Sequence, residues 1–155
     1  MFAGKRVLAV VPARGGSKGI PMKNLRTVGG RSLVAIAADV AATVPEIDRR
    51  VVSTDHTEIA RVAREAGLDA PFMRPESIAG DRIGDWDVLS HALQATEADD
   101  GEHYDIVVML QPTSPLRRAV DVSGTIHMLI NSGYDAVWSV SVSYTHLTLP
   151  TKRIV

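Results

Sequence analysis

The first apolar run of the chain is Val7-Leu8-Ala9-Val10-Val11, and a loop rich in glycine and cations comes soon after it. An unbroken apolar run of this length is typical of a strand buried on both faces, because helices cover both sides of a parallel sheet. A second run of the same kind occupies residues 106–110. The two runs therefore predict strands inside a buried, parallel sheet.

Segments with helical spacing of apolar residues separate these strands. The spacing is clearest over residues 33–44 and returns over 59–66, 86–93 and 122–130. Further short strands are predicted at Val51-Val52 and at residues 136–142. This alternation predicts an α/β fold with a three-layer, largely parallel, Rossmann-like sheet. Ligands of such sheets bind beyond the carboxyl ends of the strands, so the loops there are the candidate site.

Composition excludes several classes of protein. The 155 residues, enough for one domain or part of one, carry 17 Lys and Arg against 18 Asp and Glu. The resulting net charge of −1 provides no general attraction to nucleic acid or to an anionic membrane, so neither is expected as a partner. There is no cysteine for a disulfide or a thiolate metal site. No apolar run approaches the roughly 20 residues of a membrane span, and the start lacks signal-peptide features, so a cytoplasmic location is expected.

The loop at residues 13–24 concentrates positive charge. Its three glycines allow backbone amides to approach a polyanion closely. Cations and neutral donors together suit the phosphates of a nucleoside triphosphate. The side chains concerned are Arg14, Ser17, Lys18, Lys23 and Asn24.

Two well-known phosphate loops do not fit this segment. A Walker loop requires Ser or Thr after its lysine, whereas Gly19 follows Lys18. The dinucleotide fingerprint requires G-x-G-x-x-G, whereas the glycines here stand at 15, 16 and 19. On residue chemistry alone, the alternative is a solvated turn that carries incidental cations.

Four motifs of the chain resemble those of the acylneuraminate cytidylyltransferases, the CMP-sialic acid synthetases. They come in the family's order and at about its spacing, and the resemblance covers residues 6–142, the N-terminal two-thirds of a family domain. The motifs are residues 12–24, Ser53-Thr54-Asp55, residues 74–81 with Arg74-Pro75-Glu76, and residues 110–117 with Gln111-Pro112-Thr113-Ser114.

The resemblance implies a fold of the nucleotide-diphospho-sugar transferase type and a defined reaction. The sugar's anomeric hydroxyl attacks the α-phosphorus of CTP, pyrophosphate leaves, and a CMP-sugar forms with the help of Mg²⁺. The implied substrates are CTP and a nonulosonic, sialic-type sugar acid. The full-length parent is implied to be a homodimer.

The resemblance also assigns roles to individual residues. Arg14, Lys18 and Lys23 match the cations that meet the triphosphate and are the predicted catalytic residues. The predicted nucleotide contacts further include Ala13, Ser17, Asn24 and Arg74. The predicted sugar contacts are Gln111, Thr113 and Ser114.

Several of these residues have structural alternatives. Arg74 precedes a proline and could cap a loop, and the Gln111 amide could satisfy backbone groups at a strand end. Asp55 is interpreted as a helix cap or first-turn carboxylate. Asp81, Asp85 and Asp87 form an acidic cluster, in which Asp85-Trp86-Asp87 is interpreted as complementing the start of a helix.

The end of the chain departs from the family. The family's metal-binding aspartates lie in its final third, which finds no match here, so no metal ligand is predicted in this chain. We interpret residues 1–142 as the N-terminal part of one cytidylyltransferase domain, C-terminally truncated, and 143–155 as an unrelated tail. Such a chain is expected to bind CTP weakly or not at all, without turnover. The alternatives are a non-catalytic nucleotide-binding remnant and another sugar nucleotidyltransferase, such as a KDO-type enzyme.

Overall fold

A parallel sheet of three strands forms the centre of the fold in the computed structural model, which describes residues 1–140. Strand β1 (Val7–Pro12) lies in the middle, between β4 (Arg49–Ser53) and β5 (Ile106–Met109). In register, Val10 lies opposite Val51 on one side and Met109 on the other. All five residues of the 7–11 run are completely buried, as predicted for a central strand.

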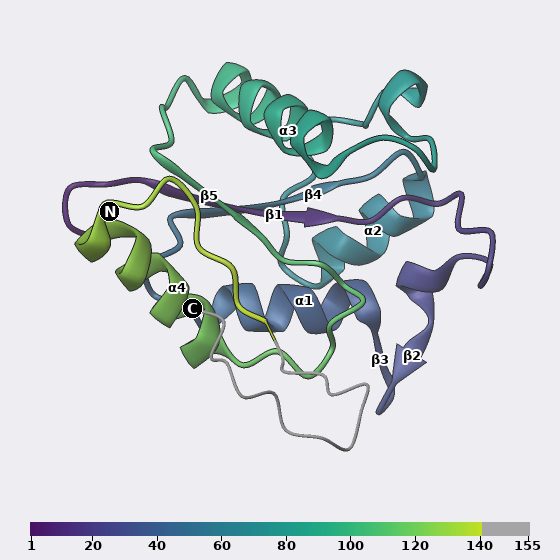
Figure 1. The fold of residues 1–155 in the computed structure, drawn as a ribbon. Helices are drawn as coiled ribbons and strands as arrows, with labels where there is room; N and C mark the ends of the chain where they lie inside the picture. Colours follow the sequence, from purple (N-terminus) through teal and green to yellow (C-terminus); the bar gives the residue numbers. More distant parts are fainter. Residues whose placement is uncertain (141–155) are drawn as a thin grey trace, which may run out of the picture.

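Helices cover both faces of this sheet (Figure 1). Val7, Ala9 and Val11 pack in one apolar cluster with residues of α1 (Leu33–Ala42), α2 (Thr57–Glu65) and α4 (Ala119–Ser132). Leu8 and Val10 point to the opposite face and pack with Ala92 of α3 (Asp85–Asp100). Because alternate side chains of β1 serve two cores, the whole strand must be apolar. The predicted three-layer α/β fold is confirmed.

Short elements connect these layers. A two-stranded antiparallel hairpin, β2 (Thr27–Val28) with β3 (Arg31–Ser32), turns through two glycines of positive φ. Its last residue, Ser32, then caps α1 by accepting a hydrogen bond from the Ala35 N–H. The 3₁₀ turns are η1 (Lys23–Leu25), in the loop after β1, and η2 (Glu76–Ile78), before α3.

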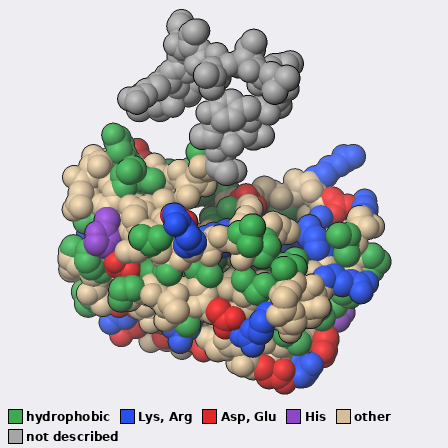
Figure 2. Space-filling view, turned by 90° about the horizontal axis from the view of Figure 1, so that it is seen from below, with side chains coloured by type: hydrophobic (Ala, Val, Ile, Leu, Met, Phe, Trp, Pro, Cys, Tyr) green, Lys and Arg blue, Asp and Glu red, His purple; other side chains and the backbone are tan. Residues whose placement is uncertain are grey.

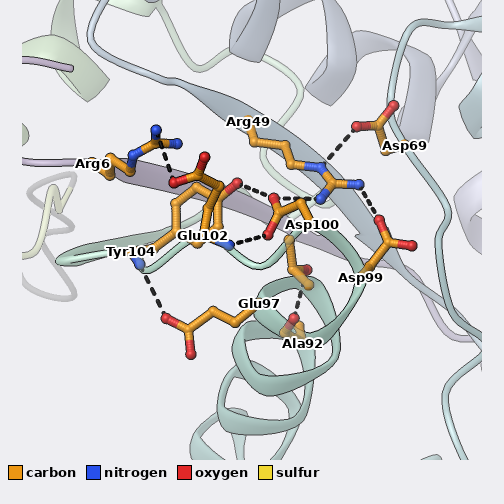
Figure 3. Close-up of polar contacts among 10 residues, drawn as sticks. Arg6, Arg49, Asp69, Ala92, Glu97, Asp99, Asp100, Glu102 and Tyr104 are labelled. Atoms are coloured by element: carbon orange, nitrogen blue, oxygen red, sulfur yellow. Dashed lines mark hydrogen bonds and ion pairs between the residues drawn. The ribbon is translucent and has the colours of Figure 1, made fainter.

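Charge is arranged differently at the two ends of the sheet. In Figure 2, several Lys and Arg side chains lie close together along the right-hand edge, the edge at which the loop after β1 lies in Figure 1. At the opposite end, Arg49 at the start of β4 contacts three carboxylates (Figure 3). Its nitrogens lie 3.0, 2.7 and 2.6 Å from oxygens of Asp69, Asp99 and Asp100. These contacts fasten the C-terminal end of α3 to β4.

The predicted last strand is wrong over the described part of its range. Residues 136–140 have no regular structure, and 141–142 lie outside the described residues. Within residues 1–140, β5 therefore pairs on one side only, with β1. No helix of this part of the chain is long and apolar enough to cross a membrane.

Candidate functional site

A cavity of about 360 Å³ lies at the carboxyl ends of β1 and β5. Residues from three of the four sequence motifs line it, although they are far apart in the chain. The lining includes seven of the predicted site residues, namely Arg14, Ser17, Lys23, Asn24, Arg74, Gln111 and Thr113. The expectation that the loops after the strands meet at one edge of the sheet is thus met.

Three predicted residues stand apart from this lining. Ala13 is completely buried, and its N–H donates to the Ser53 carbonyl at 2.9 Å, so it extends the pairing of β1 with β4. The Lys18 side chain is 86% exposed and reaches the site only through an ion pair described below. Ser114 is exposed, and its N–H donates to the Gln111 carbonyl in a turn.

Asn24 holds the glycine-rich loop in place. It is 4% exposed, and its Nδ2 donates to the Arg14 carbonyl oxygen at 2.9 Å. Two residues earlier, Met22 has a left-handed backbone, with φ of 50°. The amide therefore closes the loop across ten residues and fixes the backbone that carries the cations.

Asp55 has a different role from the one interpreted from sequence. His56 is the N-cap of α2, because its Nδ1 accepts the Glu58 N–H at 3.2 Å. Asp55 Oδ1 instead accepts the Gly15 N–H at 2.7 Å, which ties the glycine-rich loop to the end of β4. The interpretation of Asp55 as a helix cap is wrong, since a contact between two loops carries no local sequence signal.

Gly15 is required by close packing at this contact. A Cβ at Gly15 would lie 2.9 Å from both Cβ and Cδ2 of His56, closer than real Cβ atoms approach. Gly16, its neighbour, has nothing within 4 Å of its equivalent position. One glycine of the pair thus serves a close approach, and the other does not.

Arg74 both supports β4 and lines the cavity. It is 6% exposed, and its guanidinium donates to Ser53, with Nη2 2.6 Å from the carbonyl and Nε 3.1 Å from Oγ. Burial lowers the pKa of Arg74, with Asp55 opposing that shift and Arg14 adding to it. The structural and the functional interpretation of this residue are therefore compatible.

Asp81 has a role that its place in the acidic cluster does not predict. It lies before α3 and does not cap it, since the N-cap is Gly84 and has no side-chain cap bond. Its carboxylate instead forms ion pairs with Arg14 and Lys18. Hydrogen bonds from Lys18 and Arg14 lower the pKa of Asp81. Asp85, the first residue of α3, also lines the cavity.

Positive charge exceeds negative charge around the cavity. Arg14, Lys23 and Arg74 line it, with Lys18 beside them, against two lining carboxylates. Within the described residues, Lys23 has no ion pair. Those residues also contain no group of three His, Cys, Asp or Glu that could hold a metal ion. Chemically, the arrangement can bind a polyanion through side-chain cations.

The turn after β5 also contributes to the cavity. Gln111 and Thr113 line the cavity here. The Gln111 carbonyl accepts a hydrogen bond from Arg117 Nη2 at 3.3 Å, and burial lowers the pKa of Arg117. The Arg117 side chain thus holds the backbone of this turn, and Gln111 lines the cavity.

Comparison with known proteins identifies similar sequences. A family described as cytidylyltransferase matches residues 8–153. The CMP-N,N'-diacetyllegionaminic acid synthase of Legionella pneumophila is 39% identical over 113 residues, which are 73% of this chain and 48% of that protein. The pseudaminic acid cytidylyltransferase of Campylobacter jejuni is 35% identical over 109 residues, 70% of this chain and 47% of that protein. The chain thus spans about half the length of these curated relatives.

Solved structures share the fold at lower identity. A CMP:2-keto-3-deoxy-manno-octonic acid synthetase complexed with CTP matches with a TM-score of 0.69 at 22% identity, over 83% of this chain and 49% of that one. A 4-diphosphocytidyl-2C-methyl-D-erythritol synthase matches with a TM-score of 0.60 at 11% identity, over 83% and 56%. The family match reaches into residues 143–155, which lie outside the described residues, so the interpretation of that stretch as an unrelated tail stays a prediction.

Proposed function

Because this chain belongs to the cytidylyltransferase family, we propose that it forms the nucleotide-binding part of an enzyme that activates a nonulosonic, sialic-type sugar acid with CTP. The observation that carries the proposal is the cavity at the carboxyl ends of the strands, where Arg14, Lys23 and Arg74 gather. The names of the relatives, which act on legionaminic and pseudaminic acids, support a substrate of this class.

The proposed reaction is a transfer of the cytidylyl group. The sugar hydroxyl attacks the α-phosphorus and gives up its proton to water, the bond from that phosphorus to the oxygen bridging to the β-phosphorus breaks, and pyrophosphate leaves. Negative charge grows on the leaving group, and fixed cations stabilise it more than they stabilise the ground state. We assign this role to Arg14, Lys18 and Lys23, with Ser17 as a neutral donor.

Other residues of the cavity bind and orient. Arg74, rigidly held on Ser53, is assigned to the nucleotide, and Asn24 keeps the loop in shape. Gln111 and Thr113, which also line the cavity, are assigned to the sugar acid. Holding both substrates in line removes much of the entropic barrier of a two-substrate reaction.

Magnesium belongs to this proposal as the cofactor that the family resemblance implies. The residues described do not fit a metal site, since they contain no group of three suitable ligands. Asp81 is moreover engaged by two cations. The roles proposed for this chain are accordingly those of its own side chains. The proposal for the full-length parent further includes a homodimer and a cytoplasmic location.

A second candidate is a nucleotide-binding remnant without chemistry. One observation favours it for this chain. The described residues hold no group of three side chains that could bind a metal ion. The cation-lined cavity would then bind a nucleotide without transferring its cytidylyl group.

Calorimetric titration of the purified chain with CTP and Mg²⁺ tests the site. We expect weak, saturable binding that Arg14→Ala abolishes. Arg61→Ala is the matched control, because it removes the same charge at a different place. Arg61 pairs with Glu58 and Glu65 on the exposed face of α2. Equal affinity in wild type and Arg14→Ala would contradict the assignment of the loop.

Pyrophosphate release separates the two candidates. The full-length parent should release pyrophosphate from CTP only when a nonulosonic acid is present, and the 155-residue chain should bind without release. A parent that releases pyrophosphate with simple sugar 1-phosphates instead would sink the proposed substrate class.

A further inference from the structure

One carboxylate that lines the cavity pairs with two cations of the glycine-rich loop. Asp81 Oδ1 pairs with the Arg14 guanidinium, and Asp81 Oδ2 lies 2.5 Å from Lys18 Nζ. These are two of the three cations to which the proposed function assigns the triphosphate. A carboxylate and a phosphate recruit the same charged N–H donors, so they compete for them.

We propose that Asp81 is a built-in competitor for the phosphate subsite, which a phosphate group of the nucleotide must displace from Arg14 and Lys18. The proposal rests on the proposed function, since it takes the loop cations to be the triphosphate site. In the free chain Asp81 holds the two cations together, and on binding it gives them up.

Among the described residues, Asp81 is the carboxylate with which Arg14 and Lys18 form ion pairs. Lys18 is 86% exposed, and Asp81 is its ion-pair partner in the described part of the chain. The Arg14 side chain is about one-third exposed and likewise pairs with Asp81. Lys23, the third cation, lines the cavity with no ion pair among the described residues. Lys23 therefore remains available to attract the first phosphate, while Arg14 and Lys18 are blocked.

The segment that carries Asp81 is lightly anchored, so it can move aside. It connects η2 to α3, and Gly80, Asp81, Arg82 and Gly84 are all exposed. The backbone hydrogen bond that closes its turn, from the Ile83 N–H to the Gly80 carbonyl, is 3.4 Å long. Displacing Asp81 thus breaks two ion pairs and few packing contacts.

Displacement also follows from electrostatics. A phosphate seated on Arg14 and Lys18 would place its charge against the Asp81 carboxylate, and like charges at such distances repel. Asp81 cannot share these cations with the ligand at low cost. Nucleotide binding is therefore coupled to a shift of residues 79–84, next to the start of α3.

The opposite role makes the opposite prediction. If Asp81 only oriented the two cations for the ligand, its removal would weaken binding. If it competes, its removal tightens binding. The sign of the change distinguishes the two roles.

Calorimetric titration with sodium tripolyphosphate at fixed ionic strength is the decisive measurement. Tripolyphosphate has no base or sugar, so it probes the phosphate subsite alone. Asp81→Asn should bind it about 2- to 30-fold more tightly than wild type, the factor that corresponds to losing two exposed ion pairs. The matched control is Asp39→Asn, which breaks an exposed ion pair with Arg31 outside the cavity and should leave the affinity unchanged.

The same substitution made in the Lys18→Ala variant checks whether the increase in affinity depends on the cations that Asp81 contacts. In Lys18→Ala, one of the two competing contacts is already gone, so adding Asp81→Asn should raise affinity by a smaller factor. Unchanged or weaker binding of tripolyphosphate by Asp81→Asn would overturn the proposal. The proposal would also be overturned if no variant bound tripolyphosphate, because there would then be no anion subsite for which Asp81 competes.

The same titrations with CTP distinguish failure of this inference from failure of the proposed function. Tighter tripolyphosphate binding with no preference for CTP over other nucleoside triphosphates would support the competitor role of Asp81. That result would at the same time contradict a cytidine-specific site. A preference for CTP, together with unchanged tripolyphosphate affinity in Asp81→Asn, would support the cytidine-specific site and contradict the competitor role of Asp81.

Discussion

The two ends of the central sheet use charge in opposite ways. At the amino end, the cations form ion pairs with carboxylates. Arg49 contacts three of them, Lys5 pairs with Asp105, and Arg6 pairs with Glu102. At the carboxyl end, the cations of the glycine-rich loop outnumber the carboxylates, and one of them has no ion pair in the described residues.

This difference separates stability from binding. A saturated network gains nothing from a ligand and resists being opened, because breaking it leaves carboxylates crowded together. An excess of like charge costs some stability and is relieved when a polyanion binds. The amino end should therefore respond to mutation in unfolding experiments, and the carboxyl end in binding experiments.

Arg49→Ala should give the largest effect. It leaves Asp69, Asp99 and Asp100 near one another without their shared cation. We expect the free energy of unfolding to fall by about 2–3 kcal/mol, while tripolyphosphate affinity of the folded protein stays the same. Urea denaturation and calorimetric titration measure the two quantities. A loss of binding in protein that is still folded would show that the two ends are coupled.

At the carboxyl end of the sheet, Gly15→Ala should have a large effect for the addition of a single methyl group. The new Cβ would lie 2.9 Å from two atoms of His56, so either the loop or the helix start has to shift. We expect a cost of about 1–2 kcal/mol, expressed as a lower unfolding free energy, a weaker affinity for CTP, or both. Gly16→Ala is the matched control, since its Cβ meets nothing within 4 Å. Equal effects of the two substitutions would refute the close-approach argument.

Lys23→Ala should give the reverse pattern to Arg49→Ala. Lys23 lines the cavity, and its removal reduces the excess of positive charge there. Affinity for CTP should fall by about fivefold to tenfold, with the free energy of unfolding unchanged or slightly raised. Calorimetry and urea denaturation on the same samples check both halves. A clear drop in stability would indicate a structural role for this lysine.

The smallest expected effect is a pH dependence at the amino end. Burial raises the pKa of Asp100, but hydrogen bonds from Tyr104, the Glu102 N–H and Arg49 outweigh it and lower that pKa to about 2. A pKa that is depressed on folding adds stability above the unfolded value of 3.8, and this stability disappears as the pH falls toward 2. Asp100→Asn should reduce the loss of unfolding free energy between pH 5 and pH 3, measured by urea denaturation, by an amount on the order of 1 kcal/mol or less. An identical slope in wild type and variant would exclude this carboxylate as the cause.

Most of the fold and part of the site follow from local pattern. The 7–11 run predicts a strand buried on both faces, and its five residues are completely buried. Helical spacing predicts the four helices, because periodicity reports which side of a segment is covered. The positions of the predicted strands predict that Arg14 and Gln111 lie at one edge of the sheet, since carboxyl ends of parallel strands meet there, whereas the place of Arg74 at the site follows only from the family resemblance.

Strand propensity alone does not place a strand. Residues 136–140 have the apolar character of one, yet they form no regular structure. Propensity states only that side chains suit a pleated, half-buried surface, whereas a strand exists only where a neighbouring backbone completes its hydrogen bonds. That neighbour is a property of the whole fold.

The sequence by itself determined the layers of the fold and which loops carry the cations, because periodicity and loop composition are local properties. Only the tertiary structure decided which residues are in contact: Asp55 accepts the Gly15 N–H, His56 caps α2, and Asp81, in the turn before α3, pairs with Arg14 and Lys18. Each of these depends on a distance between residues remote in the chain or on a choice between competing hydrogen-bond partners. Such choices are settled only when the backbone has brought every candidate partner into reach.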